Sequence, residues 1–271
     1  MGACELIRIL VLLALLVIPT QSAWCAQGGH ASSDGAFAFA DLTGTRVLAL
    51  SRVPNPGSIR VLLAAGGRQF PVEYVGLQEP SGEGTGRDVA QNFADCGGDV
   101  FRLVGARIWP DETCFLATDS LLALGQPVPL SREHKVIAAG PNDAVVLSKG
   151  RDLKSAWSLA TFSNWGAVWL YEFEPQRDSL LATLAVWSDG QSATHDYPAK
   201  LIDPSSAWRI DDMGEFCSEC FTILFVIRTG SGYCVGVSWA GAEGESLQLL
   251  SSHGTKQLLE VMTAYRYWAP S

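Results

Sequence analysis

Short apolar segments separated by turn residues recur along most of the chain. Clusters such as PNPG at Pro54, GPND at Gly140 and TGSG at Thr229 stand between them. This spacing is typical of antiparallel strands, because Gly, Pro, Asn and Asp favour the tight turns that join them. The pattern predicts strands over residues 36–40, 46–51, 60–64, 70–77, 100–108, 113–117, 136–139, 144–147, 156–162, 167–173, 180–187, 221–228 and 233–239.

These strands predict an all-β fold, an antiparallel meander arranged as a sandwich, a barrel or a propeller-like structure. No internal period is sharp enough to indicate a repeat family, and the signature dipeptides of propeller blades are missing. We expect one short C-terminal helix over residues 255–265, because four side chains share a helical face there: Leu258, Leu259, Met262 and Tyr265.

The first residues have the layout of a secretory signal peptide. The apolar run Ile9 to Ile18 follows Arg8 and ends before Pro19 and several small residues. This run is shorter than the roughly 20 apolar residues of a membrane span. We therefore expect residues 1–26 to be a signal peptide. Glu5 is atypical of such a segment, so an uncleaved anchor stays an alternative.

Residues 27–271 are expected to form a β-rich exported domain, located in the periplasm or secreted. If the domain is divided, the best place for the division is near residues 131–155. Bulky Trp24 before Cys25 argues against a lipoprotein processing site. No second stretch is suited to cross a bilayer as a helix, since even the run 221–227 is only as long as a strand.

The composition fits a folded, acidic protein. Apolar residues make up 48% of the chain and charged residues 17%, the formal net charge is −9, and there are only five lysines. A polyanion would be repelled by this charge, so nucleic acid is not an expected partner. Carbohydrate and protein ligands both stay open, because acidity alone does not identify a partner.

The segment NWGAVWLYEF places a row of aromatic rings on one face of a strand. Trp165, Trp169 and Tyr171 alternate there with residues of the other face, and they are the candidate ligand-binding residues. Flat rings of this kind offer a stacking surface for a sugar. The expected cross-strand neighbours of Trp169 and Tyr171 are Leu184 and Ala182, which bring no hydrogen-bonding side chains. A buried core is therefore favoured over a ligand platform.

The chain beyond the signal peptide contains five cysteines: Cys96, Cys114, Cys217, Cys220 and Cys234. All five are disulfide candidates, because exported thiols usually pair. Cys96 and Cys114 form one natural couple. Cys234 is expected opposite Ile227, so a bridge to it from Cys217 or Cys220 requires the preceding segment to fold back along the hairpin. The sequence leaves the pairing open, and one cysteine is left over unless Cys25 is retained.

The cysteines do not predict a metal or redox site. Structural zinc usually takes two close pairs of ligands, whereas Cys217 and Cys220 form one pair and the four histidines are scattered. A thioredoxin-type pair opens a helix, whereas Cys220 precedes the strand-like run FTILFVIR. The acidic residues between 203 and 215 match no calcium loop. No metal and no cofactor are therefore expected.

No catalytic constellation stands out. The serine of TGSGY lies between adjacent glycines, which predicts a hairpin turn rather than a nucleophile elbow. His195, Asp211 and Ser231 follow the chain order of one class of serine hydrolase, but no flanking motif supports them. Paired carboxylates for glycoside cleavage are defined by their separation in space, so the sequence does not reveal them.

The sequence thus indicates an exported, acidic, disulfide-stapled β protein whose role is binding or structural rather than catalytic. The alternative is a secreted hydrolase acting on carbohydrate, and the sequence does not decide whether the protein is an enzyme. Two carboxylates in one cleft, or His195 with a carboxylate and a serine, would favour the enzyme. An open aromatic groove without such groups would favour a binding protein.

Overall fold

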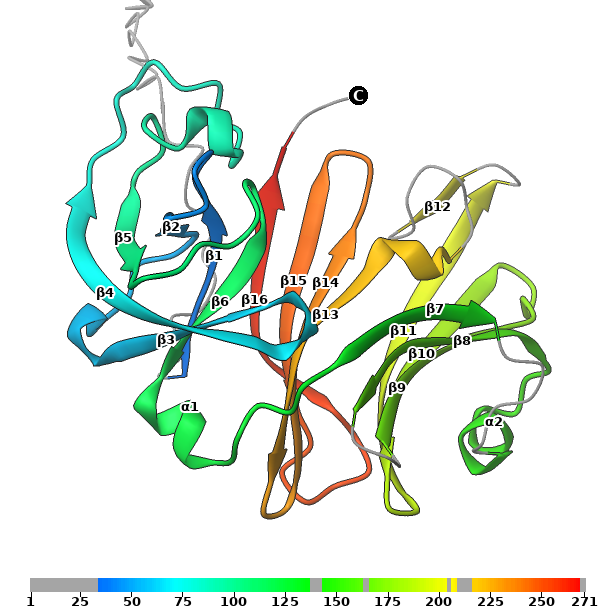
Figure 1. Cartoon of the computed structure of the whole chain (residues 1–271). Coiled ribbons are helices and arrows are strands. Elements are labelled where there is room, and N and C mark those ends of the chain that lie inside the picture. Colours follow the sequence, from blue (N-terminus) through cyan, green and yellow to red (C-terminus); the bar gives the residue numbers. More distant parts are fainter. Residues whose placement is uncertain (1–33, 137–142, 163–165, 204–205, 209–215, 269–271) are drawn as a thin grey trace, which may run out of the picture.

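Three antiparallel β-sheets lie side by side in the computed structural model, which describes residues 34–136, 143–162, 166–203, 206–208 and 216–268 (Figure 1). A closed barrel forms one side, a four-stranded sheet the middle, and a six-stranded sheet the other side. The prediction of an all-β, antiparallel fold is confirmed. Of the three architectures left open, the chain combines two, a barrel and a stack of two open sheets.

The barrel closes in the strand order β1-β2-β5-β4-β3-β6. Its strands are β1 (Gly35–Ala40), β2 (Arg46–Ala49), β3 (Ile59–Ala64), β4 (Arg68–Gln78), β5 (Gly98–Leu103) and β6 (Thr113–Thr118). The connections carry the 3-10 helices η1 (Pro56–Ser58), η2 (Ala65–Gly67) and η3 (Ala90–Asn92), and the helix α1 (Asp119–Ala123) follows the last strand.

The two open sheets come next in the chain. The six-stranded sheet has the order β12-β11-β10-β9-β8-β7, and the central sheet has the order β13-β14-β15-β16. Their elements are β7 (Ser131–Val136), α2 (Asp143–Lys149), β8 (Leu153–Phe162), β9 (Gly166–Phe173), β10 (Ser179–Ser188), β11 (Gln191–Asp203), β12 (Ser206–Trp208), η4 (Ser218–Cys220), β13 (Phe221–Thr229), β14 (Gly232–Ala240), β15 (Gly244–Ser251) and β16 (Leu259–Tyr267).

The alternation of small and large residues in β1 explains how the barrel closes. Ala36, Ala38 and Ala40 belong to the cluster that fills the barrel, where six strands leave little room for larger side chains. Phe37 and Phe39 lie on the opposite face of the strand and pack into clusters outside the barrel. All six residues of β1 are buried, because other elements cover the outer side of this strand.

Strands β13, β14 and β15 of the central sheet are mostly buried on both faces, whereas β16 is exposed on one face at Thr263 and Tyr265. Leu247 and Leu249 of β15 pack with Phe37 and Phe115 of the barrel. On the other face, residues such as Val235 pack with the six-stranded sheet. The run FTILFVI is apolar except for Thr222 because β13 packs in both cores, and a register shift between Ile223 and Phe225 changes which residues face each core.

The predicted aromatic row of β9 lies on the outer face of the six-stranded sheet. Tyr171 is 1% exposed and packs with Val145 of α2, which covers this face (Figure 1). Trp169 is partly buried and stacks on Tyr171 with ring centroids 6.0 Å apart. The predicted cross-strand neighbours were wrong by one residue, because Trp169 pairs with Ala185 and Tyr171 with Thr183. Trp165 lies outside the described residues.

The expected C-terminal helix is wrong, because residues 259–267 form the strand β16. Met262 and Ala264 pack against the barrel-side cluster, and Thr263 between them belongs to the other face. The four side chains that suggested a helical face do not share one face of the strand, since Met262 is buried toward the barrel whereas Leu259 and Tyr265 are exposed. Pairing with β15 satisfies the backbone and decides the conformation.

Two further assignments change. Residues 144–147, expected to be a strand, lie within α2, since a four-residue apolar run does not distinguish a strand from a buried helical turn. The strands β11 and β15 were not expected, because β11 contains Pro198 and many polar residues and β15 follows a glycine-rich loop. The chain leaves the barrel at Thr118 and reaches β7 at Ser131.

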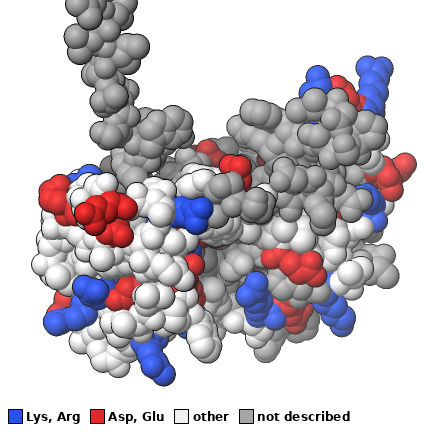
Figure 2. Space-filling model, turned by 90° about the horizontal axis from the view of Figure 1, so that it is seen from above, with Lys and Arg blue, Asp and Glu red and all other residues white. Residues whose placement is uncertain are grey.

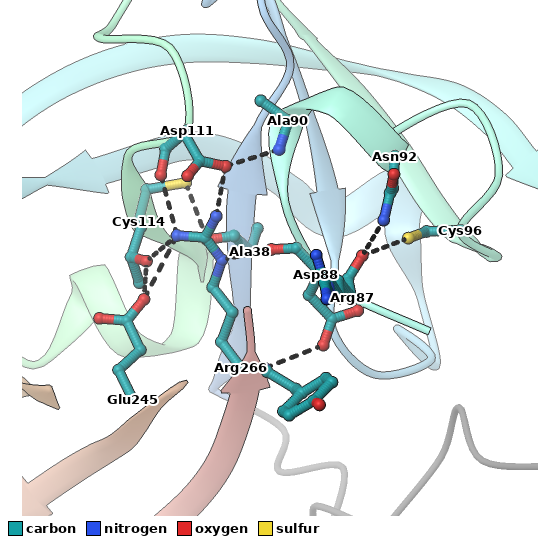
Figure 3. Close-up of polar contacts among 12 residues, drawn as sticks. Ala38, Arg87, Asp88, Ala90, Asn92, Cys96, Asp111, Cys114, Glu245 and Arg266 are labelled. Atoms are coloured by element: carbon teal, nitrogen blue, oxygen red, sulfur yellow. Dashed lines mark hydrogen bonds and ion pairs between the residues drawn. The ribbon is translucent and has the colours of Figure 1, made fainter. Parts of the chain in front are cut away.

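No disulfide joins any two of the cysteines that the structure describes. The expected couple is separated, because Cys114 belongs to the cluster inside the barrel and Cys96 to a cluster on its outside. Their thiols donate to different backbone carbonyls, Cys114 to Ala38 and Cys96 to Arg87, each at 3.4 Å (Figure 3). Cys234 pairs with Ile227, as its predicted hairpin register requires.

A buried arginine on β16 joins the central sheet to the barrel (Figure 3). Arg266 is 2% exposed. Its Nη2 donates to Asp111 Oδ1 at 2.6 Å, its Nη1 donates to Thr113 Oγ1 at 2.8 Å, and its Nε donates to the carbonyl of Asp88 at 2.7 Å. On its own sheet, Nη1 lies 3.4 Å from Glu245 Oε1. One guanidinium therefore binds two segments on the barrel side, at Asp88 and at Asp111–Thr113, and one strand of the central sheet.

The partners of Arg266 are themselves held in place. Glu245 is 5% exposed and accepts hydrogen bonds from the hydroxyls of Thr113 and Ser238. Asp111 has a φ of 64°, in the left-handed region that non-glycine residues seldom adopt. Arg266 donates to both the carbonyl and the carboxylate of Asp111, which holds this turn in place.

Among the described residues, neither α1 nor α2 has the length and apolar character needed to cross a membrane, and no other helix does.

We expect Arg266→Ala to lower the free energy of unfolding by about 3–5 kcal/mol, because it leaves the Glu245 carboxylate buried without its positive partner. Urea denaturation measures this loss. Arg102→Ala is the matched control: Arg102 pairs with Glu73, but both side chains are more than half exposed, so the loss should stay below about 1 kcal/mol. Equal losses in the two variants would contradict the role given to Arg266.

Candidate ligand-binding groove

A groove of about 800 Å³ lies between β11 of the six-stranded sheet and the central sheet. We call it the inter-sheet groove. Strands β11, β14, β15 and β16 and the loop between β14 and β15 line it, with side chains that include His195, Tyr197, Trp239, Glu243, Gln248, Glu260 and Tyr265.

Strand alternation sets which side chains reach this groove. On β15, Leu247 and Leu249 pack toward the barrel, so Gln248 between them lies on the opposite face. On β16, Arg266 contacts the barrel, and Tyr265 beside it lines the groove. The two faces of one sheet therefore carry different polar chemistry.

A chain of hydrogen bonds crosses the groove from one sheet to the other. The Tyr197 hydroxyl donates to Gln248 Oε1 at 2.8 Å, and Gln248 Nε2 donates to Glu260 Oε2 at 2.8 Å. Burial, and then the charge of Glu260, raise the pKa of Tyr197 well above its ordinary value, so the phenol stays a donor. The donor-to-acceptor direction of this series of hydrogen bonds is thus fixed, and the Glu260 carboxylate at its end is an acceptor.

His195 is oriented by the segment that precedes β16. Its Nδ1 lies 3.0 Å from the carbonyl oxygen of Leu258, and backbone hydrogen bonds between Thr194 and residues 256 and 258 hold that segment against β11. A carbonyl only accepts, so Nδ1 carries the proton in the neutral ring. The other ring nitrogen, Nε2, is then an acceptor or a base.

Aromatic rings supply the apolar part of the lining. Trp239 stacks on Phe221 at 5.2 Å with an interplanar angle of 12°, and Tyr197 packs edge-on against both rings. Tyr265 is 52% exposed, so its ring remains accessible to a ligand. Partial burial raises the pKa of the Tyr265 phenol, and the charge of Glu243 raises it further.

The described lining of the groove is acidic. It contains Glu243 and Glu260 and no lysine or arginine. Asp196 also borders it, but its carboxylate is bound by Lys149 and Thr183. Over the face shown in Figure 2, positive and negative side chains are interspersed and no single basic patch stands out.

A second hollow, of about 590 Å³, lies on the barrel side of the central sheet. Trp109, Trp268 and Arg68 line it, together with Glu245 and Arg266. Arg68 is ion-paired with Glu112, and Arg266 and Glu245 are bound to each other and to the barrel. These charged groups already satisfy one another, so we assign the hollow to the joint between the two sheets rather than to a ligand.

The structure places one of the sequence candidates in the groove. His195 lines it, whereas Ser231 lies in the turn between β13 and β14, as the TGSG pattern predicts, and Asp211 lies outside the described residues. Trp169 and Tyr171 lie on the outer face of the six-stranded sheet, away from the groove. Among the described residues, no group of three or more metal-ligating side chains comes together.

Sequence reasoning missed most of the groove. Trp239, Gln248 and Tyr265 come from three strands, two of which were not expected, so no local motif unites them. The one available signal was the polar residue Gln248 in the apolar run SLQLLS, since such a residue on a buried strand needs a polar neighbour. No known family, curated protein or solved structure matches the chain.

We expect Glu243→Gln to lower the pKa of the Tyr265 phenol toward its ordinary value, because it removes a negative charge that disfavours the phenolate. Spectrophotometric titration measures tyrosine ionisation, and Tyr265→Phe identifies which transition belongs to Tyr265. Glu260→Gln makes the same charge change in the same groove. If both glutamine variants lower this pKa equally, Glu243 is not the neighbour that raises it.

Proposed function

We propose that this protein is an exported, non-catalytic binding protein whose inter-sheet groove takes a saccharide that carries no negative charge. One observation carries the proposal: the groove combines an exposed aromatic ring, an ordered chain of hydrogen-bonding groups, and an acidic lining without lysine or arginine. The apolar N-terminal run and its small-residue end support export.

A sugar ring presents an apolar face and a rim of hydroxyls, and the groove offers a partner for each. The half-exposed ring of Tyr265 offers stacking area. Glu260, Nε2 of His195 and the carboxylate of Glu243 accept hydrogen bonds from hydroxyls. Because Tyr197 and Leu258 orient Gln248 and His195, these groups are preorganised before a ligand arrives.

Charge narrows the class of saccharide. A uronic acid or sulfated sugar would meet Glu243 and Glu260 and a net charge of −9, with no positive side chain in the described lining to compensate. Neutral sugars avoid this repulsion. The acidic lining would attract the positively charged amino group of an amino sugar.

A glycoside hydrolase is the second candidate, because Glu243 and Glu260 border one groove and glycoside cleavage uses two carboxylates. Two observations favour binding. Glu260 is already bound by Gln248, and within the described residues His195 is bound by a backbone carbonyl and not by a carboxylate or a serine. Release of reducing ends from a bound oligosaccharide would favour the hydrolase.

We expect the mature chain to bind neutral or amino-sugar oligosaccharides and not oligouronates. Isothermal titration with one oligosaccharide of each kind tests this. Tyr265→Ala and Gln248→Ala should each weaken binding about tenfold or more, since each removes a central contact group. Trp109→Ala is the matched control, because Trp109 is 73% exposed and lies outside the groove.

The failure of all uncharged and amino sugars to bind would contradict the proposal. So would binding that Tyr265→Ala leaves unchanged, or binding that Trp109→Ala abolishes.

A further inference from the structure

The described cysteines fall into two groups by their surroundings. Cys96, Cys114 and Cys234 are 7%, 0% and 2% exposed, and each belongs to a different hydrophobic cluster. Cys217 and Cys220 are only half-buried; Cys217 directly precedes the 3-10 helix η4, and Cys220 is its last residue. An oxidant in solution therefore has access to the second group and little access to the first.

The backbone between Cys217 and Cys220 forms a tight turn. The Cys220 N–H donates to the carbonyl of Cys217 at 3.1 Å, so the two residues are the ends of a four-residue turn. The Cα atoms at the ends of such a turn lie within about 7 Å of each other. Disulfides join Cα atoms about 4.4–6.8 Å apart, so this spacing suits a disulfide.

The third cysteine of this region is out of reach. Cys220 directly precedes Phe221, which pairs with Trp239 at one end of the β13–β14 hairpin. Cys234 pairs with Ile227, six residues further along β13, which corresponds to about 20 Å at the rise of a strand. Its side chain packs in the cluster between the barrel and the central sheet.

The residues on either side of the turn fix it against the sheet. Phe216 stacks on Trp239 at 6.1 Å, and Phe221 stacks on the same ring at 5.2 Å. Both phenylalanines are at most 5% exposed. The segment that carries the two cysteines is therefore held at both ends by the ring that lines the inter-sheet groove.

We infer that Cys217 and Cys220 form a disulfide with each other when the protein is oxidised, and that Cys96, Cys114 and Cys234 remain thiols. In this step the two thiols lose two protons and two electrons, and a bond forms between their sulfur atoms. The electron acceptor is the disulfide of a small thiol or of a thiol oxidoreductase, which is cleaved to two thiols by exchange. The disulfide would thus cross-link the ends of the CSEC turn, whose flanking residues Phe216 and Phe221 stack on Trp239.

The chemistry of the buried thiols agrees with this division. Burial raises the pKa of Cys234 to about 12 and raises that of Cys114 well above its ordinary value. Disulfide exchange requires the thiolate, which these two residues scarcely form near neutral pH.

The inference is tested on the full chain in a buffer of reduced and oxidised glutathione, so it depends neither on export nor on the saccharide. After acid quenching, denaturation and alkylation, mass spectrometry of the peptides reports each cysteine. We expect the peptide that holds Cys217 and Cys220 to be two hydrogens lighter and unalkylated. Cys96, Cys114 and Cys234 should all be alkylated.

Matched variants identify the bond. Cys217→Ser and Cys220→Ser should each abolish the internal cross-link, and Cys234→Ser should leave it intact. Alkylation of both turn cysteines in the most oxidising buffer would overturn the inference. So would a bond from either of them to Cys25, Cys96, Cys114 or Cys234. Loss of sugar binding by the groove variants would leave this result unchanged, so the two proposals fail independently.

Discussion

The burial of strands β13 and β14 of the central sheet on both of their faces is the constraint on which the rest of the structure depends. A strand covered on two sides needs apolar residues on both of its faces, which explains why Thr222 is the only polar residue in the run FTILFVI of β13. The barrel covers one face and the six-stranded sheet covers the other. Toward one end of the sheet the apolar lining gives way to polar residues, Glu245 and Arg266 on one face and Gln248 and Tyr265 on the other.

The polar region around Arg266 and the inter-sheet groove differ in how far their hydrogen-bonding groups are already bound within the protein. Around Arg266 every named partner is a side chain or carbonyl of the chain itself, and both members of the pair with Glu245 are nearly inaccessible. A buried pair of this kind costs desolvation but selects one arrangement of the barrel on the sheet, since any other leaves a charge unpaired. In the inter-sheet groove, Glu243, Nε2 of His195 and the ring of Tyr265 keep accessible surface for a partner.

Local patterns predicted most strands of this protein and little of its groove. The runs that became β1, β9, β13 and β14 were visible because apolar, β-favouring residues stand between clear turn signals. β16 was mistaken for a helix because Leu258, Leu259, Met262 and Tyr265 fit a helical period, whereas pairing with β15 places Met262 and Tyr265 on opposite faces of a sheet. The groove residues lie far apart in the sequence and meet only once β11 faces β15 and β16. The separation of Cys96 from Cys114 likewise depends on which side of a closed barrel each occupies.

The alternation of Tyr265 and Arg266 along β16 makes this strand intolerant of changes in length. Inserting or deleting one residue before them would exchange the two faces. The guanidinium would then enter an acidic groove, and a phenol would replace the cation that pairs with Glu245. Length changes within β16 would therefore disturb the lining of the groove and the attachment of the barrel in a single event.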